Sequence, residues 1–181
     1  MYNWNQFLDK ESAECLYTGI VTDTGSFKFS ATTSRTHEVA GKLLDLGVES
    51  QQLQNKIFDS QPAARLKLLG TMLGQMETSA DGTVVLLYLS KAQCDALGYE
   101  KGITEGFVNY GLSVDGAQIA CFMREEEGIV KISLRSKGLL DVNELARASF
   151  NGGGHKNAAG GRLDTDIAAA LAHAKTHLPW S

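Results

Sequence analysis

The chain has 181 residues, of which 43% are hydrophobic, and its 17 basic and 21 acidic residues give a formal net charge of −4. This hydrophobic fraction excludes a disordered chain, and the length suits one sizeable domain or two small ones. The acidic balance argues against a protein that coats long nucleic acid with a broad basic face. It leaves open a small anionic ligand that is held in one focused pocket.

The cysteines and the apolar segments of the sequence indicate the cellular compartment of the protein. Cys15, Cys94 and Cys121 are far apart and lack Cys-x-x-Cys spacing, which predicts neither a disulfide framework nor a zinc site and fits a reducing cytoplasm. The sequence contains no run of about 18 apolar residues, which is the length that a membrane-spanning helix needs. Residues 1–10 lack the charged and then apolar segments of a signal peptide. We therefore expect a cytoplasmic protein without a membrane segment.

Residues 1–60 are expected to be helical. A first helix would end near Thr22-Asp23-Thr24-Gly25, and further helices are predicted over 36–46 and 51–58. The apolar stripe of the first helix would consist of Phe7, Cys15, Leu16 and Ile20. Pro62 suits the start of a longer helix that connects to a second domain. The narrow apolar seam of this connector would consist of Leu66, Leu69, Leu73 and Met76.

The pattern changes after Ala80-Asp81-Gly82, which is a turn signal. Alternating strands and helices then indicate an α/β second domain. The predicted strands cover 83–89, 118–124 and 128–136, and the predicted helices cover 92–97, 142–150 and 167–178.

The most informative segment is Asn151-Gly152-Gly153-Gly154-His155-Lys156-Asn157-Ala158-Ala159-Gly160-Gly161. Each glycine costs about 1 kcal/mol against alanine in regular structure, so we expect neither a strand nor a helix interior over the glycines. Bare backbone N–H groups beside an imidazole can cradle a phosphate, and the small residues 158–161 would open a short helix. The alternative is a tight connection in which glycine only supplies positive φ.

Arg135 and Ser136 end the predicted strand 128–136, and Arg135 lies on its polar face. A guanidinium there can hold a phosphate through two hydrogen bonds or stack on a base. The alternative is an exposed arginine on a solvated face. A pocket shared by Arg135 and the glycine run would be typical of a site for a phosphorylated ligand. By its spacing alone, Asp23 is an ordinary helix end, because one carboxylate cannot hold a metal ion.

Three motifs carry a family resemblance. Residues 16–27 (Leu-Tyr-Thr-Gly-Ile-Val-Thr-Asp-Thr-Gly-Ser-Phe) resemble the last metal-site motif of the DHH phosphoesterases. Ser133-Leu134-Arg135-Ser136, and Gly152-Gly153-Gly154-His155 with Ala158-Ala159-Gly160, resemble the two signatures of the DHH-associated domain. The chain resembles most the nanoRNase branch, whose members are oligoribonucleases and phosphatases of 3′-phosphoadenosine 5′-phosphate (pAp). The resemblance covers nearly the whole chain.

This resemblance implies a fold and a set of roles. The helical C-terminal part of a DHH catalytic domain would cover 1–60, a linker helix 61–80, and a DHH-associated substrate-binding domain, with a mixed β-sheet flanked by helices, 81–181. It implies a site for two Mn²⁺ or Mg²⁺ ions with Asp23 as one ligand, and it assigns no certain catalytic residue to this chain. The residues that would bind the substrate nucleotide or phosphate are Arg135, Ser136, Gly152, Gly153, Gly154 and His155.

The early histidine, the Asp-x-Asp pair and the Asp-His-His triplet of the family are absent in their expected places. The chain therefore resembles the C-terminal portion of an enzyme that hydrolyses short RNA oligonucleotides and pAp, and we expect it to be inactive alone. The N-terminal half of the DHH domain, which this chain lacks, would be a partner. A homodimer is an alternative that the sequence leaves undecided. The alternatives are the cyclic-dinucleotide phosphodiesterase branch and a nucleic-acid-binding module without catalysis.

Overall fold

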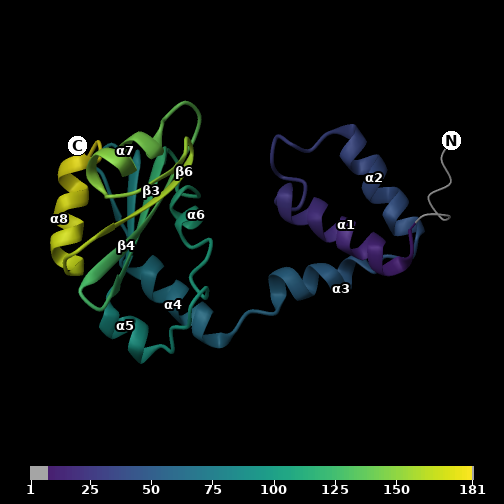
Figure 1. Cartoon of the computed structure of the whole chain (residues 1–181), viewed down its shortest axis with the longest axis horizontal. Coiled ribbons are helices and arrows are strands. Elements are labelled where there is room, and N and C mark those ends of the chain that lie inside the picture. Colours follow the sequence, from purple (N-terminus) through teal and green to yellow (C-terminus); the bar gives the residue numbers. More distant parts are fainter. Residues whose placement is uncertain (1–7, 181) are drawn as a thin grey trace. The chain divides into compact units, whose positions relative to one another are not determined.

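The computed structural model describes residues 8–180, which form two compact units that divide between Gln61 and Pro62 (Figure 1). Phe7, which the sequence places on the first apolar stripe, lies outside the described residues. None of the helices within residues 8–180 combines the length and the hydropathy that crossing a membrane requires.

The first unit is helical, as predicted. The carboxylate of Asp9 accepts the N–H of Ser12 at 2.8 Å and begins the first helix. Thr33 and Thr36 form a capping box that begins the second. The elements are α1 (Lys10–Asp23), α2 (Ser34–Asp45), α3 (Ser50–Gln54) and a π-helical turn (Asn55–Asp59).

The buried face of α1 differs from the predicted stripe. Ala13, Tyr17 and Val21 are buried, whereas Cys15 and Leu16 are exposed. The buried residues recur every four positions and so share one face of the helix. The prediction was wrong for Cys15 and Leu16, because it overlooked a small residue and an aromatic ring that fill the space between the helices, whereas Ile20 packs against the core as predicted. The small core of this unit consists of Ala13, Tyr17, Val21, Ala40, Leu43 and Val48.

The second unit contains a mixed six-stranded sheet flanked by helices, which confirms the predicted α/β fold. The strand order is β1-β2-β3-β4-β6-β5, in which β2 and β3 run parallel and the other neighbours antiparallel. The strands are β1 (Glu77–Thr78), β2 (Val84–Leu89), β3 (Ile119–Glu126), β4 (Ile129–Ser136), β5 (Gly153–His155) and β6 (Ala158–Leu163). The helices are α4 (Ala63–Gly74), α5 (Lys91–Ala96), α6 (Val108–Gly111), α7 (Val142–Ser149) and α8 (Ile167–His177).

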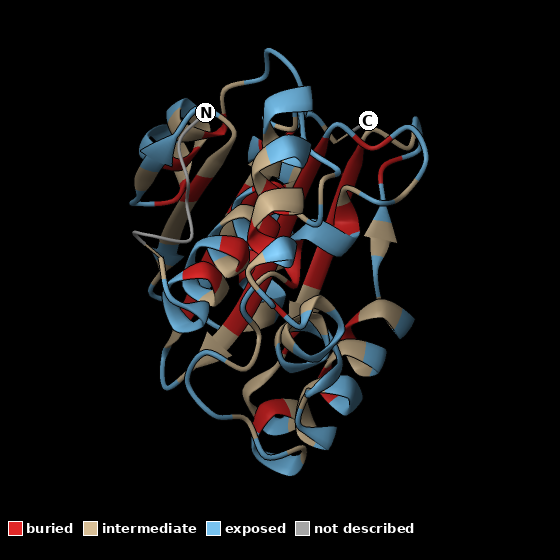
Figure 2. Ribbon diagram, turned by 90° about the vertical axis from the view of Figure 1, so that its right-hand side faces the viewer, coloured by how far each residue is buried: buried red, intermediate tan, exposed pale blue. Residues whose placement is uncertain are grey.

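Each face of the sheet carries its own core, and Figure 2 shows the buried residues concentrated on the strands. On one face, Met123 and Leu134 pack with α7 and α8 and with the fully buried Phe150. On the other face, Leu87 and Phe122 pack with α4, α5 and α6.

Helix α4 is packed on the sheet as part of the second unit. Leu68 and Met72 are fully buried in the core with β2, whereas Leu66 and Met76, at the ends of the predicted seam, are 57% and 43% exposed. The predicted seam was therefore wrong at both ends, because the sheet and not a partner helix decides which face is buried. The domain limits that the resemblance implies, with a linker over 61–80, stay a prediction.

The glycine run forms the hairpin of β5 and β6, so the expectation that it could not be a strand was wrong. Glycine is required here because neighbouring backbone segments approach each other too closely for a Cβ atom. A Cβ on Gly152 would meet the carbonyl oxygen of Gly160, and a Cβ on Gly161 would meet that of Phe150. Ala158 begins strand β6 and not the short helix that was predicted.

Candidate functional site

Strand β4 presents its polar residues to one hollow of the second unit. Lys131, Ser133 and Arg135 alternate along the strand with buried apolar residues, as predicted. They line a hollow of about 360 Å³, a volume that suits a small ligand. The other side chains of its wall belong to Tyr99, Lys101, Thr104, Glu105, Val108, Phe122 and Arg124.

Arg124 forms a buried wall of this hollow. Its guanidinium lies 4.2 Å from the ring centroid of Tyr99 and donates a 2.7 Å hydrogen bond to Glu126. The ammonium group of Lys131 reaches the same carboxylate at 3.1 Å. Burial alone would raise the pKa of Glu126, but the hydrogen bonds from Arg124 and Lys131 outweigh burial and lower that pKa. Two cations around one carboxylate leave this side of the hollow positive.

Arg135 is a cation that the fold leaves available to a ligand. Its guanidinium donates to the carbonyl oxygen of Leu134 at 2.9 Å. Within residues 8–180 it forms no ion pair with a carboxylate. A guanidinium has five N–H donors in a fixed planar arrangement, so most of them stay free for an anion.

His155 lies in the same row of the sheet as Arg135. Ala158 of β6 is the register partner of both residues, of Arg135 on one side and of His155 on the other. Directly paired residues of antiparallel strands project to the same face, and two strand spacings separate the two backbones by about 10 Å. Ala158 between them adds only a methyl group. The predicted guanidinium and imidazole therefore project from the same face of the sheet, but His155 is exposed on the edge strand and is not among the residues that line the hollow beside Arg135.

Two of the three consecutive glycines already use their N–H groups within the fold. The N–H of Gly152 donates to the carbonyl oxygen of Ala146 at 3.1 Å. The N–H of Gly154 donates to Oδ1 of Asn143 at 2.8 Å. These two groups are therefore not free to form the predicted cradle, which leaves the side chains of Arg135 and His155 as the hydrogen-bond donors of the row.

Ser136 lies on the opposite face of β4 from Arg135, because successive side chains of a strand alternate. It is buried, and its hydroxyl donates to the carbonyl oxygen of Leu140 at 2.7 Å and accepts from Nδ2 of Asn157 at 2.9 Å. The structure therefore does not bring Ser136 to the hollow that Arg135 lines.

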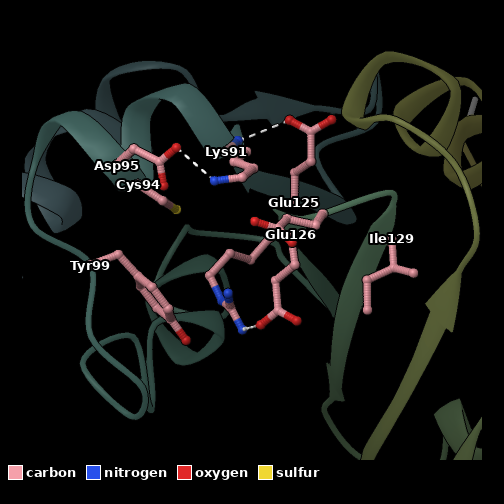
Figure 3. A pocket seen from close by; sticks show the side chains of 9 residues that line it. Lys91, Cys94, Asp95, Tyr99, Glu125, Glu126 and Ile129 are labelled. Carbon is pink, nitrogen blue, oxygen red and sulfur yellow. Dashed lines mark hydrogen bonds and ion pairs between the residues drawn. The ribbon is translucent and has the colours of Figure 1, made fainter.

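A second hollow of the same unit has a volume of about 320 Å³ (Figure 3). It shares Tyr99 and Arg124 with the first hollow. Glu125 connects two helices there, since its carboxylate accepts the N–H of Lys91 at 2.9 Å and that of Ile167 at 3.2 Å. Carboxylates are favourable at helix N-termini. The acidic residues of the wall are Asp95, Glu125, Glu126 and Glu127. This acidic wall suits a phosphate less well than the first hollow does.

Asp23 is the last residue of α1 and is exposed. It lines a hollow of about 520 Å³ within the first unit, beside Thr24 and Thr36. The Thr24 hydroxyl is already engaged, because it donates to the carbonyl oxygen of Ile20 at 2.6 Å. Nowhere in the described part of the chain do three His, Cys, Asp or Glu side chains group as a metal ion would need. Asp23 therefore forms no metal centre with other described residues, and its role as one metal ligand stays a prediction.

Three further residues that line the hollow were not predicted from the sequence: Tyr99, Lys101 and Arg124. Arg124 is the register partner of Lys131, so only the pairing of β3 with β4 reveals it. Tyr99 and Lys101 follow α5 in a segment without periodicity, which gave no signal. Lys131 did carry one, because strand alternation puts it on the same face as Arg135.

Comparisons with known proteins identify relatives of the chain. The DHHA1 domain family matches residues 69–178. The bifunctional oligoribonuclease and PAP phosphatase NrnA of Thermus thermophilus is 35% identical over 153 residues, and that of Bacillus subtilis is 31% identical over 156 residues. These alignments cover 84% and 86% of this chain but 45% and 49% of the relatives. The chain spans about half the length of the curated relatives it matches.

A solved structure agrees with the fold. The crystal structure of an exopolyphosphatase-related protein from Bacteroides fragilis is 37% identical and superposes with a TM-score of 0.89, covering 94% of this chain and 50% of that one. The DHHA1 match includes the whole sheet and its flanking helices from β1 to α8. The chain therefore belongs to the DHHA1 domain family.

Proposed function

We propose that this chain is the substrate-binding portion of a phosphoesterase that hydrolyses short oligoribonucleotides and pAp. The NrnA relatives bear the name of these two activities and share most of this chain's length. The observation that carries the proposal is the unpaired guanidinium of Arg135, which shares a sheet row with His155 and lines a positive hollow. Arg135 and His155 would bind a substrate phosphate between them.

The nucleoside part of the substrate would occupy the hollow beside Arg135. Its wall combines the apolar surfaces of Phe122 and Val108 with the ring of Tyr99 and the polar Ser133. Ligand sites commonly pair such apolar walls with a few polar groups that fix orientation. A single nucleotide fits this arrangement better than a long strand, because the positive charge is confined to one region of an acidic protein.

The metal requirement of the family is also a proposal for this chain. Asp23 would give one carboxylate oxygen to a Mn²⁺ or Mg²⁺ ion, and the other ligands would come from a part of the enzyme outside this chain. A metal pair of that kind activates water and clamps the scissile phosphate. Because residues 8–180 hold no other grouped ligands, we expect the isolated chain with Mn²⁺ to hydrolyse neither pAp nor a dinucleotide.

The binding proposal is tested by calorimetric titration of the chain with pAp. We expect Arg135→Ala to weaken binding about tenfold or more, because a charge-assisted hydrogen-bond pair is lost, and Arg135→Lys to restore only part of the affinity. Arg162→Ala is the matched control, since Arg162 lies on the same sheet but is paired with Asp164 at 3.3 Å. Equal affinities for the Arg135→Ala and Arg162→Ala variants would refute the proposal.

The choice of substrate class needs the complete enzyme. Turnover of pAp, a linear diadenylate and cyclic di-AMP by a protein that includes the missing DHH motifs separates nanoRNase activity from cyclic-dinucleotide hydrolysis. We expect pAp and the linear dinucleotide to be hydrolysed. Preference for the cyclic compound would support the alternative branch, and binding of RNA with no turnover of any of the three would support a binding module.

A further inference from the structure

Asn157 occupies the turn between β5 and β6, two residues after His155. Its side-chain Nδ2 lies 2.9 Å from Oγ of Ser136, 3.1 Å from the carbonyl oxygen of Leu140 and 3.2 Å from that of Gly138. The Ser136 hydroxyl donates to the same Leu140 oxygen at 2.7 Å. We call this group of hydrogen bonds, formed by Asn157 and Ser136 with the carbonyls of 138 and 140, the clasp.

The clasp joins two segments that carry the candidate binding groups. On one side is the end of β4, which bears Arg135, and the loop that follows it. On the other side is the turn that follows His155. Backbone bonds reinforce the connection, because Ser136 donates its N–H to the Asn157 carbonyl oxygen at 3.2 Å and Val142 donates to that of Lys156 at 2.8 Å.

Strand β5 depends on such support. It has three residues, two of them glycine, and it forms an edge of the sheet. Glycine leaves the backbone more freedom than any other residue, and a strand this short has few ladder hydrogen bonds. Helix α7 holds the segment before His155 through the N–H groups of Gly152 and Gly154, and the turn at 156–157 holds the segment after it.

We propose that Asn157, assisted by Ser136, is a positioning residue that holds His155 in the row with Arg135. This inference rests on the proposed function, in which these two side chains bind a substrate phosphate. It gives Ser136 a role on the buried face of β4, where it contacts Asn157 and not the ligand. Asn157 acts through His155, so its contribution to binding depends on the imidazole being present.

A double-mutant cycle tests this dependence, with pAp binding measured by calorimetry for Asn157→Ala, His155→Ala and the double variant. We expect Asn157→Ala to weaken binding about tenfold in the wild-type background and to have no further effect once His155 is alanine. Equal losses in both backgrounds would show that Asn157 supports only the general fold and would overturn the inference. Asn55→Ala is the control, because Asn55 is exposed in the first unit.

A second measurement needs no ligand. We expect hydrogen exchange of the Ser136 and Val142 amides, which bond to residues 157 and 156, to become faster in Asn157→Ala than in Asn55→Ala. Unchanged exchange would show that the clasp does not hold the turn. The proposed function can fail separately. It fails if the wild-type chain binds no pAp, or if Arg135→Ala leaves pAp binding unchanged. In either case the exchange of these two amides can still respond to Asn157→Ala.

Discussion

Gly161 shows how the absence of one Cβ fixes the local fold. A Cβ there would meet the carbonyl oxygen of Phe150 and come within 2.9 Å of the Phe150 Cβ. Phe150 is fully buried, and its carbonyl oxygen also accepts the N–H of Arg162 at 2.8 Å. Neither group can move away without disturbing the core. Packing therefore requires glycine in this hairpin, even though glycine is a poor strand former.

We expect Gly161→Ala to lower the free energy of unfolding by about 1–3 kcal/mol, because the added methyl group overpacks the contact with Phe150. Urea denaturation measures the change. Gly70→Ala is the control: Gly70 is exposed within α4, and a methyl group there would meet nothing within 4 Å beyond the backbone of its own helix. Alanine at this position should raise stability by up to about 1 kcal/mol. Two variants of equal stability would contradict the packing argument.

At the scale of elements, the sequence predicted best the segments in which one side is polar. Alternation along β4 gave both its burial pattern and the polar face with Lys131 and Arg135. The sequence did not predict β5 and β6 as strands, because pairing with neighbouring strands makes these residues extended although their own strand propensity is low. The buried face of α1 was also predicted incorrectly. Ala13 has too little apolar surface to stand out in a sequence, although its position between helices requires a small residue.

The β3–β4 hairpin is also expected to make the stability of the protein depend on pH. The pKa of Glu126 is lowered in the folded protein, so its carboxylate stabilises the fold above the ordinary value of 4.5, and this contribution is lost as the pH falls through the folded pKa. We expect Glu126→Gln to destabilise the protein near pH 7 and to cost progressively less below pH 4.5. Urea titrations across this range measure it. A difference that does not change with pH would argue against the ion-pair contribution, and Glu100→Gln, an exposed carboxylate, is the control.

At the scale of the whole molecule, the candidate site was only partly predictable. The motifs identified Arg135 and His155, but their common row depends on strand order, since β6 lies between β4 and β5. The family resemblance grouped Ser136 with Arg135 as substrate-binding residues, and strand geometry separates the two to opposite faces. Tyr99 reaches the hollow only through tertiary packing against Arg124. Chemistry can be read from local motifs, whereas the assembly of a site needs the pairing of distant segments.

The second unit contains two cores of its own on the faces of one sheet, which predicts that it folds independently. We expect a chain of residues 62–181 to unfold in one cooperative thermal transition and to bind pAp with the affinity of the full chain. Circular dichroism and calorimetry measure these properties. A fragment that lacks a cooperative transition would show that residues before Pro62 complete its fold.

The strands at the two margins of the sheet are short: β1 has two residues and β5 has three. The N–H of Gly154 in β5 is also taken up by Asn143. A long margin of free backbone groups is a template on which another chain can add a strand and begin a fibril. Because β1 and β5 each offer so little of that template, we expect neither of these two strands to nucleate strand addition between crowded copies of this domain.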